Sequence, residues 1–251
     1  MLGEYVFLAS YVGKVLHGHK HKSEASLLVR VGIHHAGKTR GIRHAMSLIA
    51  PNWHGDGIKE FSAKDSQIDM LSILGSLPVC WDDIKKHTGA LKTISETIIP
   101  MHNSTAISTD SGTIQPCTLP CYTANDEELR ELLAVNTALP GRMCIMKVNK
   151  PAKVISHNNL RLERAMKGAS KGLGLLIGIK VNEGGCEKLA DRLETLEPGL
   201  DSRVYKDLAL NWWYSDKAAE LLGSNKSRVA QLKKCVEDYI TTHMLAASVE
   251  Y

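Results

Sequence analysis

Residues 25–49 read ASLLVRVGIHHAGKTRGIRHAMSLI, and three patterns follow one another in this stretch. Residues 25–31 are short and apolar, which is typical of a buried strand. The segment 32–37 begins and ends with glycine and interrupts that strand. Residues 38–49 then carry apolar side chains at helical spacing, and Pro51 marks the end of the helix. A strand, a glycine-bounded turn and an amphipathic helix in this order predict an α/β fold.

The turn matches the pattern G-x-x-x-x-G-K-[ST] through Gly32, Gly37, Lys38 and Thr39. Glycines let the backbone approach an anion closely, and successive N–H groups then point at it, helped by the N-terminus of the following helix. In this arrangement Lys38 reaches the outer phosphates of a nucleotide, and the Thr39 hydroxyl holds Mg²⁺. We therefore expect ATP and Mg²⁺ as cofactors. The candidate phosphate-binding residues are Gly32, Ile33, His34, His35, Ala36, Gly37, Lys38, Thr39 and Arg40.

A chain of this length matches the pattern by accident roughly one time in a hundred, given ordinary residue usage. The alternative is a glycine-rich turn followed by a helix with an exposed lysine. The strand before the motif and the amphipathic helix after it favour the phosphate-binding interpretation.

Two acidic residues, Asp82 and Asp83, directly follow the apolar segment 77–81. Asp82 is a candidate Mg²⁺ ligand acting through water, and Asp83 a candidate general base or water-positioning group. The alternative is that this pair caps a helix from Ile84 onward.

Polar residues also follow the next apolar segment, where Asn125 is placed to contact a γ-phosphate and an attacking water. Its alternative role is an Asx turn before a helix. Arg142 is a candidate arginine finger acting on the nucleotide of a neighbouring subunit, or else a surface arginine. Weaker candidates for the same role are Arg130, Arg161 and Arg164.

Strands and helices alternate up to residue 148. The patterns predict a short helix over 5–16, strands over 58–63, 77–81, 118–123 and 143–148, helices over 65–75, 86–100 and 127–135, and a hairpin or long loop over 103–116. From about residue 155 the chain reads as mainly helical, with candidates over 187–196, 201–222 and 224–244. The order favours a parallel sheet flanked by helices with a mainly helical C-terminal region. We expect an N-terminal helix and linker over 1–24, a P-loop ATPase core over 25–150 and the helical region over 151–251.

Composition narrows the setting. The 251 residues are 43% apolar, enough for a sizeable core, and the net charge of +4 permits a polyanionic partner without demanding one. No apolar run approaches the length of a membrane span, and no secretory signal precedes the first strand, so we expect an intracellular protein without a membrane partner. The six cysteines fit reduced thiols better than a zinc site, although Cys117 and Cys121 form a C-x3-C pair. The histidine-rich segment 17–24 fits a solvated loop better than a metal tract.

The order of these parts resembles the AAA+ class of ring-forming ATPases. More narrowly, it resembles superfamily 3 helicases and the ATPase modules of phage and mobile-element primase-helicases. The resemblance rests on VGIHHAGKT (31–39), LPVCWDD (77–83) and YTAN (122–125), and it covers residues 25–149. It implies that Asp82 and Asp83 match the acidic pair, that Asn125 matches the sensor and that Arg142 is nearest to the finger. It also implies an oligomeric motor that acts on single- or double-stranded DNA.

The sequence departs from that family in one respect. Superfamily 3 helicases carry a basic hairpin before the sensor strand, whereas residues 97–125 contain no Lys or Arg. The leading hypothesis is therefore an oligomeric ATPase motor acting on nucleic acid. The alternative is a nucleotide-dependent switch or oligomerisation module with slow hydrolysis and no unwinding. A small-molecule kinase ranks third because the arginine cluster expected of its lid is missing.

Overall fold

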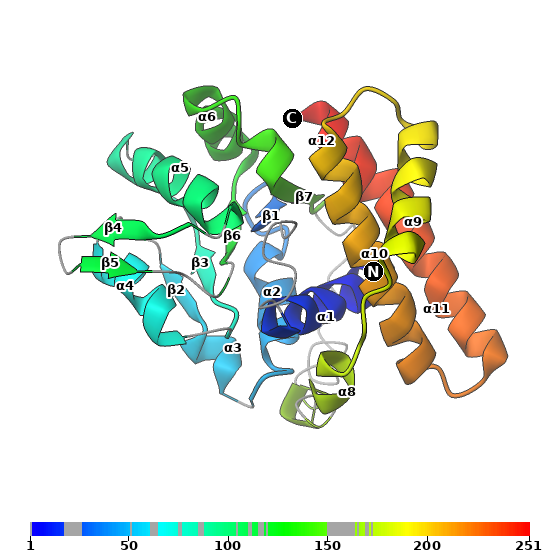
Figure 1. The fold of residues 1–251 in the computed structure, drawn as a ribbon. Coiled ribbons are helices and arrows are strands. Elements are labelled where there is room, and N and C mark those ends of the chain that lie inside the picture. The colour runs from blue at the N-terminus through cyan, green and yellow to red at the C-terminus, as the bar shows by residue number, and fades with distance from the viewer. Residues whose placement is uncertain are drawn as a thin grey trace.

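A computed structural model describes residues 2–17, 27–50, 52–60, 65–74, 77–84, 88–103, 105–109, 112–114, 118, 120–149, 164, 166–168, 171 and 173–251 (Figure 1). Its first half alternates strands and helices: α1 (Leu2–His17), β1 (Leu27–Val31), α2 (Lys38–Met46), α3 (Trp53–Asp56), β2 (Ile58–Glu60), α4 (Asp65–Leu74), β3 (Cys80–Asp82), α5 (Thr88–His102), β4 (Ile107–Thr109), β5 (Gly112–Ile114), β6 (Cys121–Ala124), α6 (Asp126–Val135), the 3-10 helix η2 (Pro140–Arg142) and β7 (Met143–Lys147). Helices follow: α8 (Leu173–Ile177), α9 (Glu183–Leu196), α10 (Ser202–Leu222), α11 (Lys226–Tyr239), the π-helical turn η4 (Ile240–Met244) and α12 (Leu245–Glu250).

Five strands form one sheet in the order β2-β3-β6-β1-β7, and every neighbouring pair is parallel. β6 and β7, the last two strands in sequence, lie on either side of β1, because the connection between them crosses β1. All five carboxyl ends meet at one edge, and a parallel sheet binds ligands at that edge where the strand order reverses. The carboxyl ends of β1 and β6 are therefore the place to look for a site.

Alternate residues of the central strands pack into two separate cores. Leu28, Cys121 and Cys144 face a core shared with α1, α2 and the C-terminal helices. Val29 and Tyr122 face the opposite core, which α4, α5 and α6 complete. This alternation follows from the two-residue period of a strand, and it gives a three-layer arrangement of helices on both faces of the sheet.

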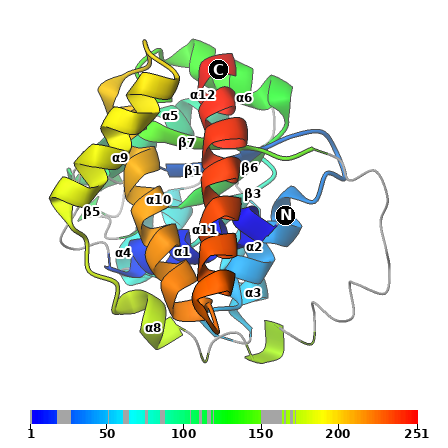
Figure 2. The same ribbon diagram turned by 90° about the vertical axis from the view of Figure 1, so that its right-hand side faces the viewer.

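The first helix packs against the last ones. α1 contacts α10 and α11 as well as α2, so it lies between the C-terminal helices and the sheet, as both views show (Figures 1 and 2). The apolar side chains that it buries include Phe7, Leu8 and Tyr11. Of the helices described, none is both long and apolar enough to cross a bilayer.

The predicted elements are found, with shifted boundaries. β3 begins at Cys80 and β6 at Cys121, later than expected, because Pro78 and Pro120 offer no N–H to a ladder. The predicted helix over 38–49 ends at Met46, where turn hydrogen bonds from Leu48 and Ile49 replace it. The segment 103–116 contains the short antiparallel hairpin β4–β5.

The predicted boundaries of two C-terminal helices were also wrong. α9 begins at Glu183 rather than at residue 187, since Asn182 caps it by accepting a hydrogen bond from the Gly185 N–H at 2.8 Å. The glycines in its first turn hid that start. The last predicted helix does not stop at residue 244 but passes through a π-helical turn and continues to Glu250.

Candidate functional site

The β1–α2 loop joins the central strand to the first helix after it. Gly37 adopts φ 91°, a left-handed conformation that glycine accepts without strain, and α2 begins at the next residue. Gly32 lies so close to β7 that a Cβ there would overlap the carbonyl oxygen of Val148. Inside the loop the Ala36 N–H donates to the Ile33 carbonyl at 3.2 Å. The two glycines of the motif thus allow a tight loop at the carboxyl edge of the sheet.

Lys38 is buried at the start of α2 and folds back over the loop. Its Nζ donates to the carbonyl oxygens of Gly32 at 2.8 Å and Ile33 at 3.3 Å, and to Oδ1 of Asn125 at 2.8 Å. Burial lowers the pKa of Lys38, while the nearby carboxylate of Asp83 opposes that shift. The alternative expected an exposed lysine after the turn, and the structure instead buries Lys38.

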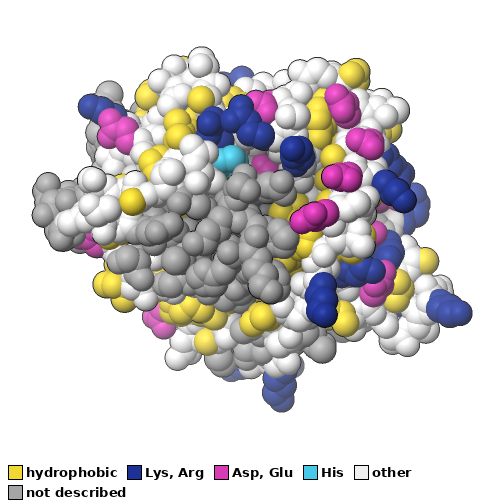
Figure 3. Space-filling view, in the orientation of Figure 1, with side chains coloured by type: hydrophobic (Ala, Val, Ile, Leu, Met, Phe, Trp, Pro, Cys, Tyr) yellow, Lys and Arg dark blue, Asp and Glu magenta, His cyan; other side chains and the backbone are white. Residues whose placement is uncertain are grey.

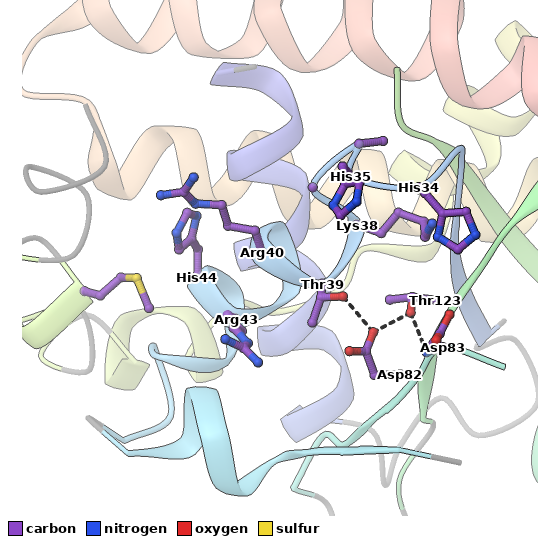
Figure 4. A pocket seen from close by; sticks show the side chains of 13 residues that line it. His34, His35, Lys38, Thr39, Arg40, Arg43, His44, Asp82, Asp83 and Thr123 are labelled. Carbon is purple, nitrogen blue, oxygen red and sulfur yellow. Dashed lines mark hydrogen bonds between the residues drawn. The ribbon is translucent and has the colours of Figure 1, made fainter. Parts of the chain in front are cut away.

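Thr39, Asp82 and Thr123 form a connected hydrogen-bond chain at the same edge (Figure 4). The Thr39 hydroxyl donates to Oδ1 of Asp82 at 2.7 Å, and the Thr123 hydroxyl donates to the same oxygen. The Thr123 hydroxyl also accepts the backbone N–H of Asp83 at 2.8 Å. These residues come from α2, β3 and β6, so the series of hydrogen bonds links three elements.

Asp83 is exposed and adopts φ 54°, which is uncommon for a residue other than glycine. The helix-cap alternative for the acidic pair is not supported, since α5 begins only at Thr88. The turn after β3 is instead held by β6: the Ile84 N–H donates to the Thr123 carbonyl at 3.1 Å.

A pocket of about 730 Å³ opens over these groups. Its lining comprises His34, His35, Ala36, Gly37, Lys38, Thr39, Arg40, Arg43, His44, Asp82, Asp83, Thr123 and Met166. The His34 and His35 side chains are exposed at the tip of the loop, and Ile33 is exposed but is not among the lining residues. Burial, together with Arg40 and Arg30, lowers the pKa of His44 to about 4, so its imidazole is neutral at neutral pH.

Asn125 lies where the sequence predicted a turn before a helix, and it also contacts the loop lysine. It is the N-cap residue of α6, and its backbone N–H donates to Oε2 of Glu128 at 2.6 Å. Its side-chain oxygen at the same time accepts from Lys38. Capping fixes the residue, and the amide is then held against the loop lysine.

Arg142 lies away from this pocket. It precedes Met143, which pairs with Leu27 at the amino end of β1, so a strand of five residues, about 16 Å, separates it from the carboxyl edge. Its Nη1 donates to the Ala138 carbonyl at 2.6 Å. Burial and the neighbouring Arg203 lower the pKa of Arg142. The structure therefore does not bring it to the nucleotide-site candidates of its own chain.

The weaker arginine candidates that the structure describes, Arg130 and Arg164, are not among the pocket residues either. Arg130 forms an ion pair with Glu250 at 3.2 Å and stacks on the ring of Tyr251. Arg164 is exposed and does not line the pocket, and Arg161 lies outside the described residues.

The two less favoured metal sites, the C-x3-C pair and the histidine-rich segment, fall largely outside the described residues. Within the described part of the chain, no group of three or more His, Cys, Asp and Glu gathers around one point. The described cysteines are thiols, of which Cys80, Cys121 and Cys144 are buried and Cys186 and Cys235 half-buried. Cys117 and the histidine-rich segment 18–24 lie outside the described residues.

Four pocket residues were not assigned a role from the sequence: Thr123, Arg43, His44 and Met166. Thr123 is the most informative of them because its hydroxyl joins both members of the acidic pair. Its position at the end of an apolar strand was visible in the sequence. That β6 lies between β1 and β3 was not, and this order is what places the hydroxyl beside Asp82.

The donor set fits a phosphorylated ligand with a hard cation. Hydroxyl and carboxylate oxygens are the ligands that Mg²⁺ prefers, and Thr39 and Asp82 already meet through a hydrogen bond. An ammonium, a helix N-terminus and the arginines Arg40 and Arg43 supply positive charge on the same pocket.

Comparison with known proteins identifies a similar fold but no family. No family model and no curated protein sequence matches this chain. A solved structure described as "SCCmec type IV Cch - active helicase" superposes with a TM-score of 0.60 at 15% sequence identity. The match covers 96% of this chain and 47% of that one, so this chain spans about half the length of the helicase that it resembles. The two proteins share a helicase-like α/β fold.

Proposed function

We propose that this chain is a module that binds and hydrolyses a nucleoside triphosphate, and that it belongs to a helicase-like motor. The observation that carries the proposal is the hydrogen bond between the Thr39 hydroxyl and the Asp82 carboxylate, 2.7 Å long, beside the buried ammonium of Lys38. Residues from two distant segments thereby form one cation and phosphate site. A chance match to the loop pattern would not predict this acidic partner.

In the proposed role, the β1–α2 loop and the first N–H groups of α2 bind the phosphates. Lys38 moves its ammonium from the carbonyl oxygens of Gly32 and Ile33 to the outer phosphates. Thr39 and Asp82 would hold Mg²⁺, which neutralises charge on the phosphate oxygens when it is bound. Thr123 keeps the Asp82 carboxylate oriented toward Thr39.

Hydrolysis requires a group that orients water, and Asp83 is the best-placed candidate. It is exposed at the pocket, its backbone is fixed by the Thr123 hydroxyl, and its charge acts on Lys38. Its carboxylate would accept a proton from the attacking water or hold that water in position. Asn125 contacts Lys38 and would report whether the outer phosphate is present.

The motor part of the proposal is supported by the fold shared with a helicase along almost the whole chain. It predicts a homo-oligomer, because Arg142 lies at the opposite edge of the sheet and only a neighbouring copy could bring it to the pocket. Nucleic acid is the proposed partner, with single-stranded DNA as the first to test.

The test measures ATP turnover of the size-exclusion-purified chain with and without single-stranded DNA. Lys38→Ala removes the phosphate-facing ammonium and should reduce turnover by at least about a hundredfold. Lys92→Ala is the matched control, since Lys92 is an exposed lysine on α5 whose pairing with Glu96 spans 3.7 Å. Turnover that survives in Lys38→Ala at the level of Lys92→Ala would contradict the proposal.

A second candidate, a nucleotide-dependent switch with slow hydrolysis, is favoured by the charge distribution. The hairpin β4–β5 lies in a segment without Lys or Arg. On the face that Figure 3 shows, cationic and anionic side chains are intermixed over the C-terminal helices. For example, Lys233 pairs with Glu220 at 2.6 Å and Lys234 with Asp238 at 3.3 Å. Assembly that depends on ATP, with a turnover that DNA leaves unchanged, would favour the switch over the motor.

A further inference from the structure

The strand that leads into the β1–α2 loop contains a buried charge. Arg30 is 1% exposed in β1 although its neighbours in the strand are apolar. A buried guanidinium is costly unless partners satisfy it, so its contacts indicate why it is there. Arg30 has no role in the phosphate, cation and water contacts proposed above.

Arg30 hydrogen-bonds to the backbone where the β1–α2 loop ends and α2 begins. Its Nη1 donates to the carbonyl oxygen of Lys38 and, at 3.4 Å, to that of Gly37. Register explains this reach, because Arg30 lies opposite Thr123 in the ladder and faces the same side as α2. The first turn of α2 is therefore hydrogen-bonded to two strands of the sheet, through Arg30 of β1 and through Asp82 of β3.

The helix leaves room for this contact at one position. A Cβ built on Gly41 would overlap the Arg30 guanidinium, whose three terminal atoms are the nearest atoms to it. Glycine in the middle of a nine-residue helix is less favourable than alanine because it loses more backbone entropy on folding. The guanidinium that occupies the space beside it accounts for the glycine.

The bonded carbonyls belong to the peptide units whose N–H groups are those of Lys38 and Thr39. In a planar trans peptide the N–H points away from the C=O, so these donors point away from Arg30. They are also among the first N–H groups of a helix, which have no partner within it. Hydrogen bonds in a series polarise one another, so a cation on the carbonyl makes the N–H a stronger donor to an anion.

Arg30 has a second partner on a different element. Its Nη2 forms an ion pair with Glu4 of α1, whose side chain is 18% exposed. Around Glu4, α1 packs on α11: a Cβ on Gly3 would overlap the carbonyl oxygen of Cys235. Burial raises the pKa of Tyr239 on α11, and the charges of Glu4 and Arg30 also act on it. The pair thus lies where α1, α11 and the base of the loop meet.

We propose that Arg30 is a positioning residue for phosphate binding, which fixes and polarises the first peptide units of α2 and ties them through Glu4 to α1 and the C-terminal helices. This inference deepens the proposed function and rests on it. Arg30 would not touch the nucleotide. It would set the affinity of the N–H donors that do, and packing changes among the C-terminal helices would reach the loop through Glu4.

The experiment measures the affinity of the full chain for a fluorescent ATP analogue with Mg²⁺, and for inorganic tripolyphosphate in competition. Arg30→Met should weaken both by about tenfold or more, the scale of a lost charge-assisted hydrogen bond. Equal losses are expected because Arg30 acts at the phosphate end. Arg30→Lys should recover part of the affinity, and KM should change more than kcat. Arg192→Met is the matched control, since it removes an arginine from an exposed ion pair with Glu237.

Glu4→Gln isolates the link to α1 while leaving Arg30 on the carbonyls, and we expect a loss of about threefold or more. Circular dichroism establishes that each variant is folded at the assay temperature; if Arg30→Met is not, Arg30→Lys and Glu4→Gln still decide. Affinity for both ligands equal to that of Arg192→Met in the Arg30 variants would overturn the proposal. Wild-type affinity in Glu4→Gln alone would overturn the tie to α1. If even the unaltered chain bound neither ligand, the proposed function itself would be wrong, which is a different result.

Discussion

The ammonium of Lys38 lies 2.8 Å from the side-chain oxygen of Asn125, a residue 87 positions further along the chain. With the carbonyl oxygens of Gly32 and Ile33, this contact occupies the three donors that an ammonium has. In the proposed role, phosphate oxygens would replace some of these partners, and Asn125 is the partner that lies outside the loop, directly after β6. The contact connects the loop to the end of β6.

Asn125→Ala tests that connection. Removing the amide leaves Lys38 with its two loop carbonyls, so we expect affinity for ATP to change by less than about threefold and turnover to fall by at least about tenfold. Asn125→Asp instead adds a negative charge beside the phosphates, and it should weaken binding itself. Equilibrium binding and steady-state turnover on the same samples separate the two effects. Equal loss of turnover and affinity in Asn125→Ala would contradict a role that begins only after binding.

The Thr39 hydroxyl offers a sharper test of the cation site. Thr39→Ser keeps the donor to Asp82, whereas Thr39→Val keeps the shape and removes the hydroxyl. We expect Thr39→Ser to retain most of the turnover and Thr39→Val to lose at least about tenfold. Affinity for ATP should respond to Mg²⁺ in the serine variant and much less in the valine variant, as titrations with and without a chelator would measure. A valine variant that keeps the full Mg²⁺ response would exclude Thr39 from the cation site.

The position of Arg142 predicts complementation between defective chains. If Arg142 serves a neighbouring copy, Arg142→Ala should lower turnover by about a thousandfold. Lys38→Ala should also lower turnover, through the loop of its own chain. Mixing the two variants creates some interfaces that have both an intact loop and an intact arginine. Turnover of the mixture should then exceed the sum of the separate variants. Additive behaviour, or normal turnover in Arg142→Ala alone, would show that the arginine does not act across an interface.

Asp216 on α10 predicts a pH dependence of stability away from the site. Burial is the main cause that raises the pKa of this carboxyl from its usual 3.8 to about 6, although Lys233 opposes the shift from 3.9 Å. The folded state then holds the proton more tightly, so the free energy of unfolding falls as pH rises from about 4 to about 6. Asp216→Asn removes this loss. Its melting temperature relative to the unaltered chain should therefore increase over that range.

Asp238→Asn is the control for that measurement, because Asp238 is an exposed carboxyl paired with Lys234 on α11. Its melting-temperature difference should stay nearly constant over the same range. A difference for Asp216→Asn that is constant or that shrinks as pH rises would refute the assignment.

Local patterns in the sequence were sufficient to predict the strands of the sheet, the helices that flank it and the loop after β1. The loop pattern combines backbone and side-chain requirements within eight residues, so it is legible without tertiary information. Asp82 and Asn125 were found because strand ends are marked by a change from apolar to polar residues. Their assembly beside Lys38 then follows from a parallel sheet.

Neither the strand order nor the position of α1 could be predicted from the sequence, and one residue was missed for each of these reasons. Thr123 acquires its contacts because β6 lies between β1 and β3, and nothing in the spacing of segments specifies that order. Arg30 was visible as a charge in an apolar strand. Its partners, however, lie in α1 and at the start of α2, and only the fold reveals them.

The same strand order bears on how the protein is made. β1 is paired on one side with β6, about 90 residues later, and on the other with β7, which ends at Lys147. α1 precedes the sheet in the chain and packs on α10 and α11, which follow the sheet. Pairings of such separation form slowly, and a growing chain exposes its unpaired edges until they do. On the ribosome, therefore, the loop emerges before β6 and β7 and reaches its working shape only after they have emerged, and α1 lacks two of its packing partners until α10 and α11 follow.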